Sequence, residues 1–283
     1  MAEAGGVLVI GADGAIGEAV AARLEAGGAR VVRTSRRGTA GTLPLDLAAV
    51  PDAWIPPAGI ASAVFCAPVT STDACRDRPE QCRRVNVDAT LDLGRRLAAA
   101  GARTVFLSTN MVFDGSMPCV PATAPRCPRT AYGCMKAEAE EGLLTLGGTT
   151  IVRLTKVVGR TLPVIERWRQ ALSRSEPIHP LADLVMAPVA LDFAAAVIAA
   201  AAREPLGPIL QVSALADVTY AAVACRLAAR WGFPADLVRP QTVSASELTL
   251  EHVPLHTTLD GSAVRDRLGL QPPDPWAAID EVA

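Results

Sequence analysis

Short apolar segments alternate with helical patterns through the first half of the chain. Segments of this length suit the strands of a parallel sheet that is covered on both faces, and they lie at residues 7–10, 30–34, 62–66, 104–108 and 149–154. Apolar residues at helical spacing predict helices over about residues 17–26, over about residues 79–100 and from about residue 132. The alternation predicts an α/β fold with a Rossmann-type doubly wound parallel sheet.

The second half of the chain is less regular. Helical patterns cover residues 164–172, 189–202 and 218–231, and two short helices follow near the C-terminus. Residues 209–212 and residues near 237–243 read as strands. We therefore expect a smaller C-terminal substrate lobe, with one segment that returns to the main sheet. In residue numbers, the nucleotide-binding domain is predicted at 1–160 plus about 187–215, and the lobe at about 161–186 and 216–283.

Composition excludes some classes of partner. Half of the 283 residues are apolar and 20% are charged, which is enough for a large buried core. The 27 basic and 29 acidic side chains give a formal net charge of −2, so no general polyanion-binding surface is expected. Aromatic residues make up only 4%, which argues against a base-stacking platform for nucleic acid.

The sequence also predicts a cytoplasmic protein that has no membrane-spanning segment and binds no metal. The N-terminal apolar run ends at Gly11 without a preceding basic stretch, and the apolar residues 187–202 include Asp192 and are too few for a span. The seven cysteines are an odd number without CxxC spacing, as is usual for reduced thiols. Cys119 and Cys127 share a Pro-rich loop that could bind a metal, but few histidines could join them.

A glycine-rich turn follows the first expected strand at once. Gly11-x-x-Gly14-x-x-Gly17 leads directly into the first expected helix. Glycines at these positions permit a tight turn and close approach of a pyrophosphate, and the helix N-terminus offers free N–H groups to the phosphates. An ordinary strand-to-helix turn is the alternative, but the position at the start of an α/β chain favours a dinucleotide site.

The end of the second strand bears on which dinucleotide is bound. Arg36 and Arg37 stand where an NAD site usually has an acidic residue for the ribose hydroxyls. Arginines suit a 2′-phosphate, which favours NADP(H), although they could also form a solvated basic turn. Asp46 is placed to accept a hydrogen bond from the adenine amino group, or else to cap a helix.

A tyrosine and a lysine are paired at helical spacing. The chain has only two tyrosines and two lysines, and one of each falls in Tyr132-Gly-Cys-Met-Lys136. Residues four apart share one helix face, and a nearby ammonium lowers the pKa of a phenol toward neutral pH. We therefore expect Tyr132 to act as a proton donor whose pKa Lys136 lowers, with Lys136 also binding the nicotinamide ribose. A surface pair on a helix is the alternative.

Ser108 and Thr109 end the fourth strand, at the carboxyl edge of the sheet where such folds bind ligands. Thr109 is expected to offer its hydroxyl to a substrate oxygen as negative charge develops there. Ser108 is expected to point into the strand packing instead.

These features together resemble the extended short-chain dehydrogenases, specifically the dTDP-4-dehydrorhamnose reductase group. Besides the glycine-rich turn and the Tyr–Lys pair, the resemblance rests on Asp73-x-Cys-x-x-x-Pro79-Glu80, Val85-Asn86-Val87-x-x-Thr90, Ser108-Thr109-x-x-Val112-Phe113-Asp114-Gly115, Val152-Arg153-Leu154 through Gly159, and Pro254-Leu255-His256-Thr-Thr-Leu259-Asp260. It extends over nearly the whole chain. It implies hydride transfer between NAD(P)H and the 4-keto carbon of a nucleotide-linked deoxysugar.

The resemblance also implies site residues. The catalytic set is Thr109, Tyr132 and Lys136. The expected cofactor-binding residues are Gly11, Gly14, Ala15, Ile16, Gly17, Ser35, Arg36, Arg37, Asp46, Leu47, Cys66, Ala67 and Pro68, together with Tyr132 and Lys136. The expected substrate contacts are Asn110, Met111, Lys156 and His256. A nucleotide-linked keto sugar is the expected partner, and a homodimer is compatible with the family.

Departures from the family pattern fall around the sugar. Asn110-Met111 replaces the usual Asp-Tyr, and Lys156 stands where an aromatic residue is common. Lys156 could contact an anionic group or simply be a solvated or helix-capping ammonium. Two other functions stay open: a non-catalytic NADP-binding regulatory subunit of another enzyme, and a sugar nucleotide epimerase or dehydratase. A dehydratase usually needs an acidic pair beside the threonine, which Asn110-Met111 does not supply.

Overall fold

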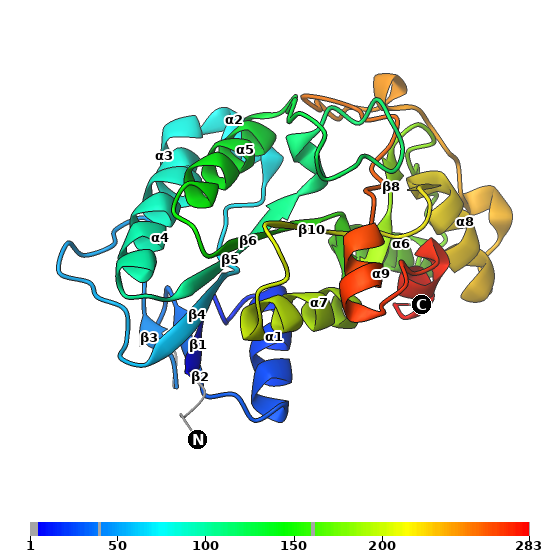
Figure 1. The fold of residues 1–283 in the computed structure, drawn as a ribbon. Helices are drawn as coiled ribbons and strands as arrows, with labels where there is room; N and C mark the ends of the chain where they lie inside the picture. Colours follow the sequence, from blue (N-terminus) through cyan, green and yellow to red (C-terminus); the bar gives the residue numbers. More distant parts are fainter. Residues whose placement is uncertain (1–4, 39–40, 160–161, 283) are drawn as a thin grey trace.

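A seven-stranded parallel sheet forms the centre of the molecule (Figure 1). The computed structural model describes residues 5–38, 41–159 and 162–282. The strand order is β10-β6-β5-β4-β1-β2-β3. Its strands are β1 (Gly6–Ile10), β2 (Val31–Ser35), β3 (Leu43–Pro44), β4 (Ile60–Phe65), β5 (Arg103–Thr109), β6 (Thr149–Leu154) and β10 (Ile209–Val212). The order reverses between β1 and β4, and ligands of such sheets bind at that point. The predicted Rossmann-type α/β fold is confirmed.

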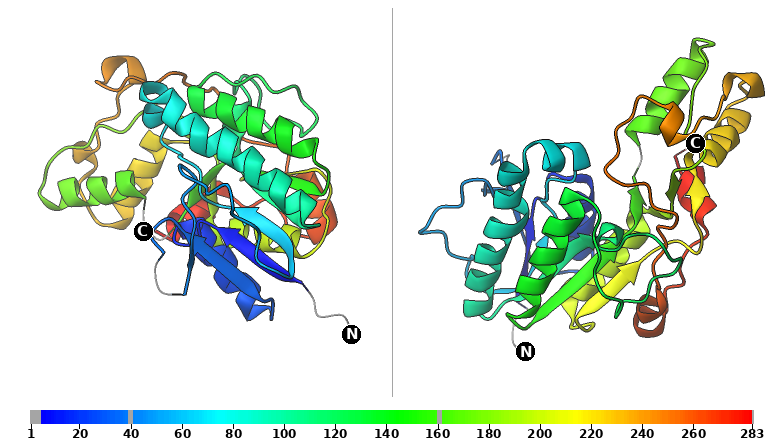
Figure 2. Two further views of the ribbon diagram at one scale, coloured as in Figure 1. Left: turned by 90° about the vertical axis from the view of Figure 1, so that its left-hand side faces the viewer. Right: turned by 90° about the horizontal axis from the view of Figure 1, so that it is seen from above.

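The strands are buried because helices cover both faces of the sheet. On one face lie α2 (Thr72–Asp77), α3 (Pro79–Arg83), α4 (Thr90–Ala99) and α5 (Ala131–Leu144), while α1 (Ala15–Ala26) and α7 (Leu191–Arg203) lie on the other (Figures 1 and 2). All five residues of β1 are buried, as a continuously apolar strand requires. The predicted helix over residues 79–100 is one continuous helical stretch in which a π-helical segment, Arg84–Ala89, joins α3 to α4. α2 was not predicted.

The C-terminal lobe stands beside the carboxyl edge of the sheet. It contains β7 (Lys156–Val158), α6 (Pro163–Ser173), β8 (Val185–Met186), β9 (Pro188–Ala190), β11 (Val218–Thr219), α8 (Tyr220–Arg230) and α10 (Pro275–Asp280), whereas α9 (Ser262–Leu268) packs against α7 and β10 in the core of the main sheet. The right-hand view of Figure 2 shows α6 and α8 projecting away from the sheet. The lobe has its own apolar core, which includes Trp168, Leu172, Val223 and Leu227. The predicted return of residues 209–212 to the main sheet is confirmed by β10, whereas the domain boundary expected at residue 160 lies outside the described residues.

The strand expected near residues 237–243 is wrong. Short 3₁₀ turns, Ala235–Leu237 and Val243–Ala245, lie at its ends, and between them only Val238 and Gln241 form isolated bridges, to Ile178 and Leu181. Pro240 cannot donate a backbone hydrogen bond, so a continuous ladder is disfavoured there. The helix expected from residue 218 begins later, at Tyr220, because Val218–Thr219 pairs with β8 and the Thr219 hydroxyl accepts from the Ala222 N–H.

Candidate active site

The glycine-rich turn between β1 and α1 is packed too closely for side chains at two of its glycines. Gly11 has a φ of +82°, and a Cβ there would lie 2.5 Å from the Ala67 Cβ. A Cβ on Gly17 would lie 2.2 Å from the Gly11 carbonyl oxygen. At Gly14 the nearest atom would be 3.6 Å away, which leaves room beside the backbone. The turn therefore holds helix and strand together through Gly11 and Gly17 and keeps Gly14 accessible.

The N-terminus of α1 is open toward a cavity. Gly14 is its N-cap, and no side chain caps the helix, so the N–H groups of the first turn are available to a ligand. We call this cavity of about 430 Å³ the sheet-edge cavity. It is lined by Gly14, Ala15, Ile16, Cys66, Pro68, Thr70, Leu107, Ser108, Thr109, Tyr132, Leu154, Thr155, Lys156 and Val157. The open helix end and the cavity fit an elongated phosphate-containing ligand.

Two residues with hydroxyl side chains line this cavity at the end of β5. Thr109 is buried, and its Oγ1 accepts a hydrogen bond from the Met111 N–H at 3.2 Å, which begins a 3₁₀ turn, Asn110–Val112. Ser108 is buried and its Oγ has no hydrogen-bond partner among the described residues. Ser108 borders the sheet-edge cavity, but its Oγ is itself buried, as expected for a residue that points into the strand packing. Thr109 and Ser108 thus both lie at the carboxyl edge of the sheet, beside the cavity.

Tyr132 and Lys136 lie in the first turns of α5. The Thr130 hydroxyl starts this helix by accepting from the Gly133 N–H at 3.0 Å. Tyr132 lines the sheet-edge cavity, whereas Lys136 is fully buried, with its Nζ 3.8 Å from the centroid of the Phe106 ring. Lys136 lines a small adjoining cavity of about 10 Å³, together with Leu47, Phe65, Ala67, Pro68, Asn86, Thr90 and Phe106.

Burial is the largest influence on the pKa values of Tyr132 and Lys136. It raises the pKa of Tyr132 above its ordinary value, and it lowers the pKa of Lys136 to about 7. Burial likewise raises the pKa of the Cys66 thiol to about 12. The structure contradicts the expectation that Lys136 lowers the Tyr132 pKa, because desolvation of the phenol is the larger effect and the ammonium sits over Phe106. At neutral pH Tyr132 is consequently a protonated phenol, the form that can donate a proton.

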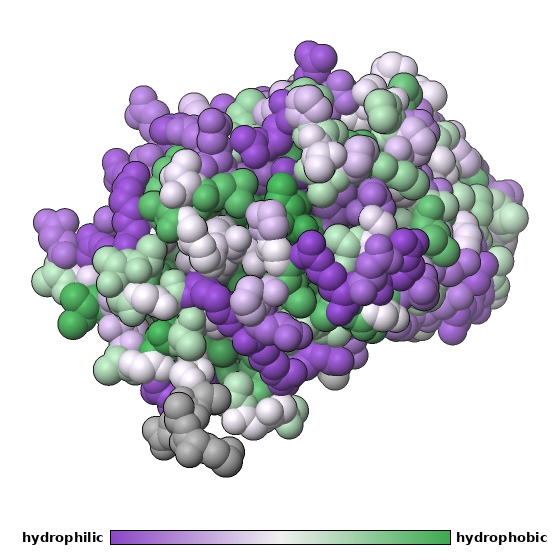
Figure 3. Space-filling model, in the orientation of Figure 1, coloured by the Kyte–Doolittle hydropathy of each residue, from purple (hydrophilic) through white to green (hydrophobic). Residues whose placement is uncertain are grey.

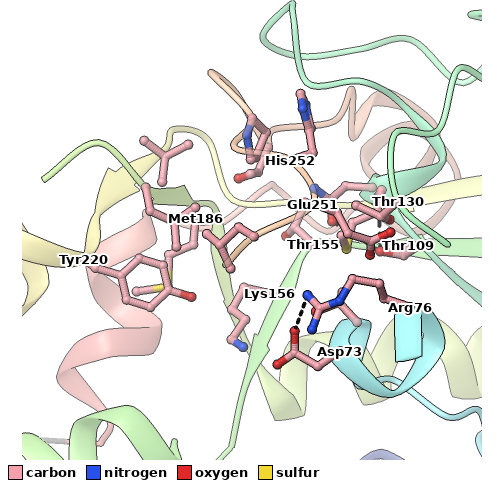
Figure 4. Close-up of a pocket in the computed structure, with 18 residues that line it drawn as sticks. Asp73, Arg76, Thr109, Thr130, Thr155, Lys156, Met186, Tyr220, Glu251 and His252 are labelled. Atoms are coloured by element: carbon pink, nitrogen blue, oxygen red, sulfur yellow. Dashed lines mark hydrogen bonds and ion pairs between the residues drawn. The ribbon is translucent and has the colours of Figure 1, made fainter. Parts of the chain in front are cut away.

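A second cavity, of about 330 Å³, lies between the edge of the sheet and the lobe (Figure 4). We call it the interlobe cavity. It is lined by Thr72, Asp73, Arg76, Thr109, Asn110, Met111, Thr130, Thr155, Lys156, Leu184, Val185, Met186, Tyr220, Leu250, Glu251, His252, Pro254 and Thr257. Thr109, Thr155 and Lys156 line both cavities, so the two meet at these residues.

Three of the expected substrate residues reach the interlobe cavity: Asn110, Met111 and Lys156. His256 instead lines a smaller neighbouring cavity of about 30 Å³, which also borders Asn110 and Met111. Its Nδ1 lies 3.5 Å from Asp217, which also accepts a hydrogen bond from the Thr257 N–H. His256 therefore helps to hold the C-terminal segment beside the cavity.

The residues expected to bind the adenosine part of the cofactor lie beside acidic as well as basic side chains. Arg36 and Arg37 are both exposed, and one Arg37 guanidinium nitrogen lies 3.8 Å from Asp13. Ser35 is fully buried, and its Oγ lies 3.0 Å from the Thr42 hydroxyl, at hydrogen-bonding distance. Asp46 accepts from the Ala48 N–H at 2.9 Å, in a turn that no helix follows. The alternative of a helix N-cap for Asp46 is thus wrong, and its adenine contact stays a prediction.

The sequence of the chain matches the model of a known family. The model of the family described as RmlD substrate binding domain matches residues 5–283. The chain belongs to this family.

Curated relatives of this RmlD-family chain fall into two functional groups. The beta subunit of methionine adenosyltransferase 2 from Pongo abelii is 30% identical over 97 residues, which cover 34% of this chain and 29% of the relative. A dTDP-4-dehydrorhamnose reductase from Streptomyces griseus is 32% identical over 139 residues, which cover 48% of this chain and 44% of the relative. The matches therefore span less than half the length of these curated relatives.

The fold likeness extends over the whole chain. The crystal structure of dTDP-4-dehydrorhamnose reductase from Bacillus anthracis, in complex with NADP, has a TM-score of 0.83 at 18% identity. The alignment covers 100% of this chain and 98% of that one. At this identity the likeness shows that the two chains share a fold.

Several residues that line the interlobe cavity do not stand out in the sequence. Asp73 was noted only as part of a motif, and Arg76, Thr155, Tyr220, Glu251 and His252 were not singled out at all. Rarity, which indicates Tyr132, could also have indicated Tyr220 and His252, because the chain has only two tyrosines and three histidines. Glu251 could not be found from the sequence, since it reaches the site by accepting from the Ala131 N–H at the start of α5, 120 residues away along the chain.

All seven cysteines are free thiols, and the described residues include no group of three or more His, Cys, Asp or Glu side chains that could hold a metal ion. Within the described ranges, no helix has the length and apolar character needed to cross a membrane. On the face drawn in Figure 3, hydrophilic and hydrophobic residues are interspersed.

Proposed function

We propose that the protein is an NADPH-dependent reductase of the 4-keto group of a nucleotide-linked deoxysugar. The observation that carries the proposal is the meeting of the two cavities at Thr109, with the Tyr132 phenol lining the cavity on the α1 side. A dinucleotide in the sheet-edge cavity and a sugar in the interlobe cavity would share that boundary. The curated Streptomyces griseus relative, a dTDP-4-dehydrorhamnose reductase, supports this class of substrate.

The chain's own residues divide the work of carbonyl reduction. Bound NADPH supplies the hydride to the keto carbon. Tyr132 donates its phenolic proton to the keto oxygen, and its raised pKa keeps it protonated at neutral pH. Thr109 donates a hydrogen bond to the same oxygen, and such a donor in the transition state is typically worth about 3–4 kcal/mol. A contact between Lys136 and the nicotinamide ribose stays a prediction, because Lys136 is fully buried and lines the small adjoining cavity instead of the sheet-edge cavity.

The residues present fit a dinucleotide. Gly14, Ala15 and Ile16 line the sheet-edge cavity at an uncapped helix N-terminus, which suits a pyrophosphate. The Ser108 hydroxyl, buried and without a partner among the described residues, would gain a hydrogen bond from a ligand there. Preference for NADP(H) over NAD(H) is part of the proposal. It is supported by the exposed Arg36 and Arg37, and by the Bacillus anthracis neighbour, whose structure holds NADP.

A second candidate is a non-catalytic, NADP-binding regulatory subunit. The relatives named as beta subunits of methionine adenosyltransferase 2 favour it, although the match covers only 29% of the Pongo abelii protein. The two candidates predict opposite results in one assay, because a regulatory subunit needs no proton donor. A cytoplasmic location and a homodimer stay predictions.

Replacement of Tyr132 by Phe tests the proposed role. The variant keeps the ring among its apolar neighbours Cys75, Cys82, Val87 and Met135 but has no transferable proton. We expect kcat for NADPH oxidation with a 4-keto nucleotide sugar to fall by roughly a hundredfold or more, with the NADPH dissociation constant nearly unchanged.

The other tyrosine supplies the control. Tyr220→Phe makes the same chemical change at the far side of the interlobe cavity and should leave kcat much closer to wild type. Turnover that survives Tyr132→Phe undiminished would show that another group donates the proton. A wild-type protein that binds NADPH and turns over no 4-keto sugar nucleotide would favour the regulatory subunit.

A further inference from the structure

Lys156 occupies the boundary between the two cavities. It is the first residue of β7, and its backbone is fixed because β7 pairs with β9 in parallel and the preceding Thr155 hydroxyl donates to the Ala187 carbonyl at 2.6 Å. Its side chain is exposed and lines both cavities. In Figure 4 it extends from β7 toward the side of the cavity where Asp73 and Arg76 lie.

Other charges that line the interlobe cavity already have partners. Arg76 is 3.0 Å from Asp73 and 2.8 Å from Asp77, and it also donates to the Thr249 carbonyl. The Glu251 carboxylate accepts from the Ala131 N–H at 3.0 Å. His252 is hydrogen-bonded to the Asp114 carbonyl at 2.6 Å. Each of these groups therefore already has an ion pair or a hydrogen bond within the protein.

Lys156 differs from these groups. Within the described part of the chain, no carboxylate lies within 4.0 Å of its ammonium, and no hydrogen bond engages it. The surrounding protein partly desolvates the ammonium and so lowers the Lys156 pKa. A partly desolvated charge without a counter-charge is unfavourable, and an anionic ligand would relieve that cost.

The position of Lys156 limits which part of a ligand it can meet. Hydride transfer must take place where the two cavities adjoin, and Thr109, Thr155 and Lys156 are the residues they share. In the proposed complex, the C4 keto group of the sugar ring lies where the two cavities adjoin. The diphosphate is attached to C1, which is across the ring from C4. Lys156 therefore faces the sugar rather than the nucleotide.

We propose that the substrate sugar carries a carboxylate, and that Lys156 binds it through a charge-assisted hydrogen bond. This inference rests on the proposed 4-keto reductase function and revises its substrate class from a deoxysugar to a nucleotide-linked keto sugar acid. A neutral sugar of the same shape would leave the ammonium unpaired, so Lys156 acts as a specificity determinant.

Dead-end ligands allow a test by binding alone. The NADPH-loaded protein would be titrated with UDP-glucuronate and UDP-glucose, and with the corresponding thymidine diphosphate pair, all of which lack a keto group to reduce. We expect the wild type to bind the acid of a pair on the order of tenfold or more tightly than the neutral sugar. Lys156→Met should abolish this ratio with little change for the neutral sugar, and Lys156→Arg should retain it. Arg95→Met is the control and should leave the ratio unchanged, because Arg95 is an exposed basic residue on α4 that lines neither cavity.

The outcomes separate the inference from the function on which it rests. Equal binding of acid and neutral sugar by the wild type overturns the inference and leaves the reductase proposal standing. A Lys156→Met variant that loses NADPH affinity and keeps the ratio assigns Lys156 to a cofactor phosphate, which also overturns it. Failure of the wild type to bind any of the nucleotide sugars contradicts both.

Discussion

At the scale of single residues, burial decides the chemistry of the site. Tyr132 and Lys136 are four residues apart on α5, as the sequence indicates, yet they face different cavities and their pKa values move in opposite directions. Helical spacing predicted that they share a face. It could not predict that Phe106, which comes from β5, places its ring under the Lys136 ammonium. The effect of one group on the titration of another depends on this tertiary packing.

The lowered pKa of Lys136 predicts that the free energy of unfolding depends on pH. Its folded-state value of about 7 lies below the unfolded value of about 10.4, so the unfolded chain binds the extra proton between these limits. The stability that Lys136 contributes is thus complete above pH 10.4 and is lost as the pH falls through 7. Relative to Lys136→Met, the wild type should gain up to about 1.4 kcal/mol of unfolding free energy per pH unit between pH 7 and 10. Urea unfolding of both proteins at pH 7, 8 and 9 measures this, and parallel stability curves would disprove the assignment.

At the scale of elements, a buried ion pair ties distant segments to the sheet. Arg153 on β6 and Glu140 on α5 are both fully buried, with a 2.7 Å contact between Nη2 and Oε2. Arg153 also donates to the Ala122 carbonyl, and Gln211 on β10 donates to the carbonyls of Val120 and Asp260. The Pro-rich loop that carries Cys119 and Cys127 is thereby held against the sheet and the C-terminal segment.

This network gives a stability prediction with a control on the same helix. Glu140→Gln leaves the Arg153 guanidinium buried without a counter-charge and should lower the free energy of unfolding by about 3–5 kcal/mol. Glu138, two residues earlier, pairs with Arg83 at the surface, with both side chains 46% exposed. Glu138→Gln should therefore cost less than about 1 kcal/mol. Chemical denaturation of the two variants provides the comparison, and similar losses would show that the buried pair has no special role.

Prediction from the sequence succeeded for elements whose pattern is local. The continuously apolar strands and the glycine-rich turn were found because burial on both faces and close packing leave direct signatures in the residues themselves. The two-residue strands β3, β8 and β11 were missed, since their pairing depends on what the fold places beside them. The same holds in the site, where Thr109 and Tyr132 follow from motifs, while Arg76 and Glu251 arrive through α2 and the C-terminal segment.

At the scale of the whole molecule, the two cavities lie where the sheet meets the lobe. The sheet supplies Thr109 and the glycine-rich turn, and α5 supplies Tyr132. The lobe supplies Lys156, Met186 and Tyr220 across the gap. Residues of the sheet and of the lobe line the interlobe cavity together, so the proposed reaction requires both parts.

Hydride transfer to a sugar carbon is the central claim, and isotope transfer tests it most directly. The protein would be incubated with NADPH that carries deuterium at the transferable C4 position, and with a set of 4-keto nucleotide sugars that includes acids. We predict that at least one product gains one deuterium at C4, detected by mass spectrometry and NMR, and that Tyr132→Phe largely abolishes its formation. NADPH binding without deuterium in any product would contradict the account and would favour a regulatory subunit instead.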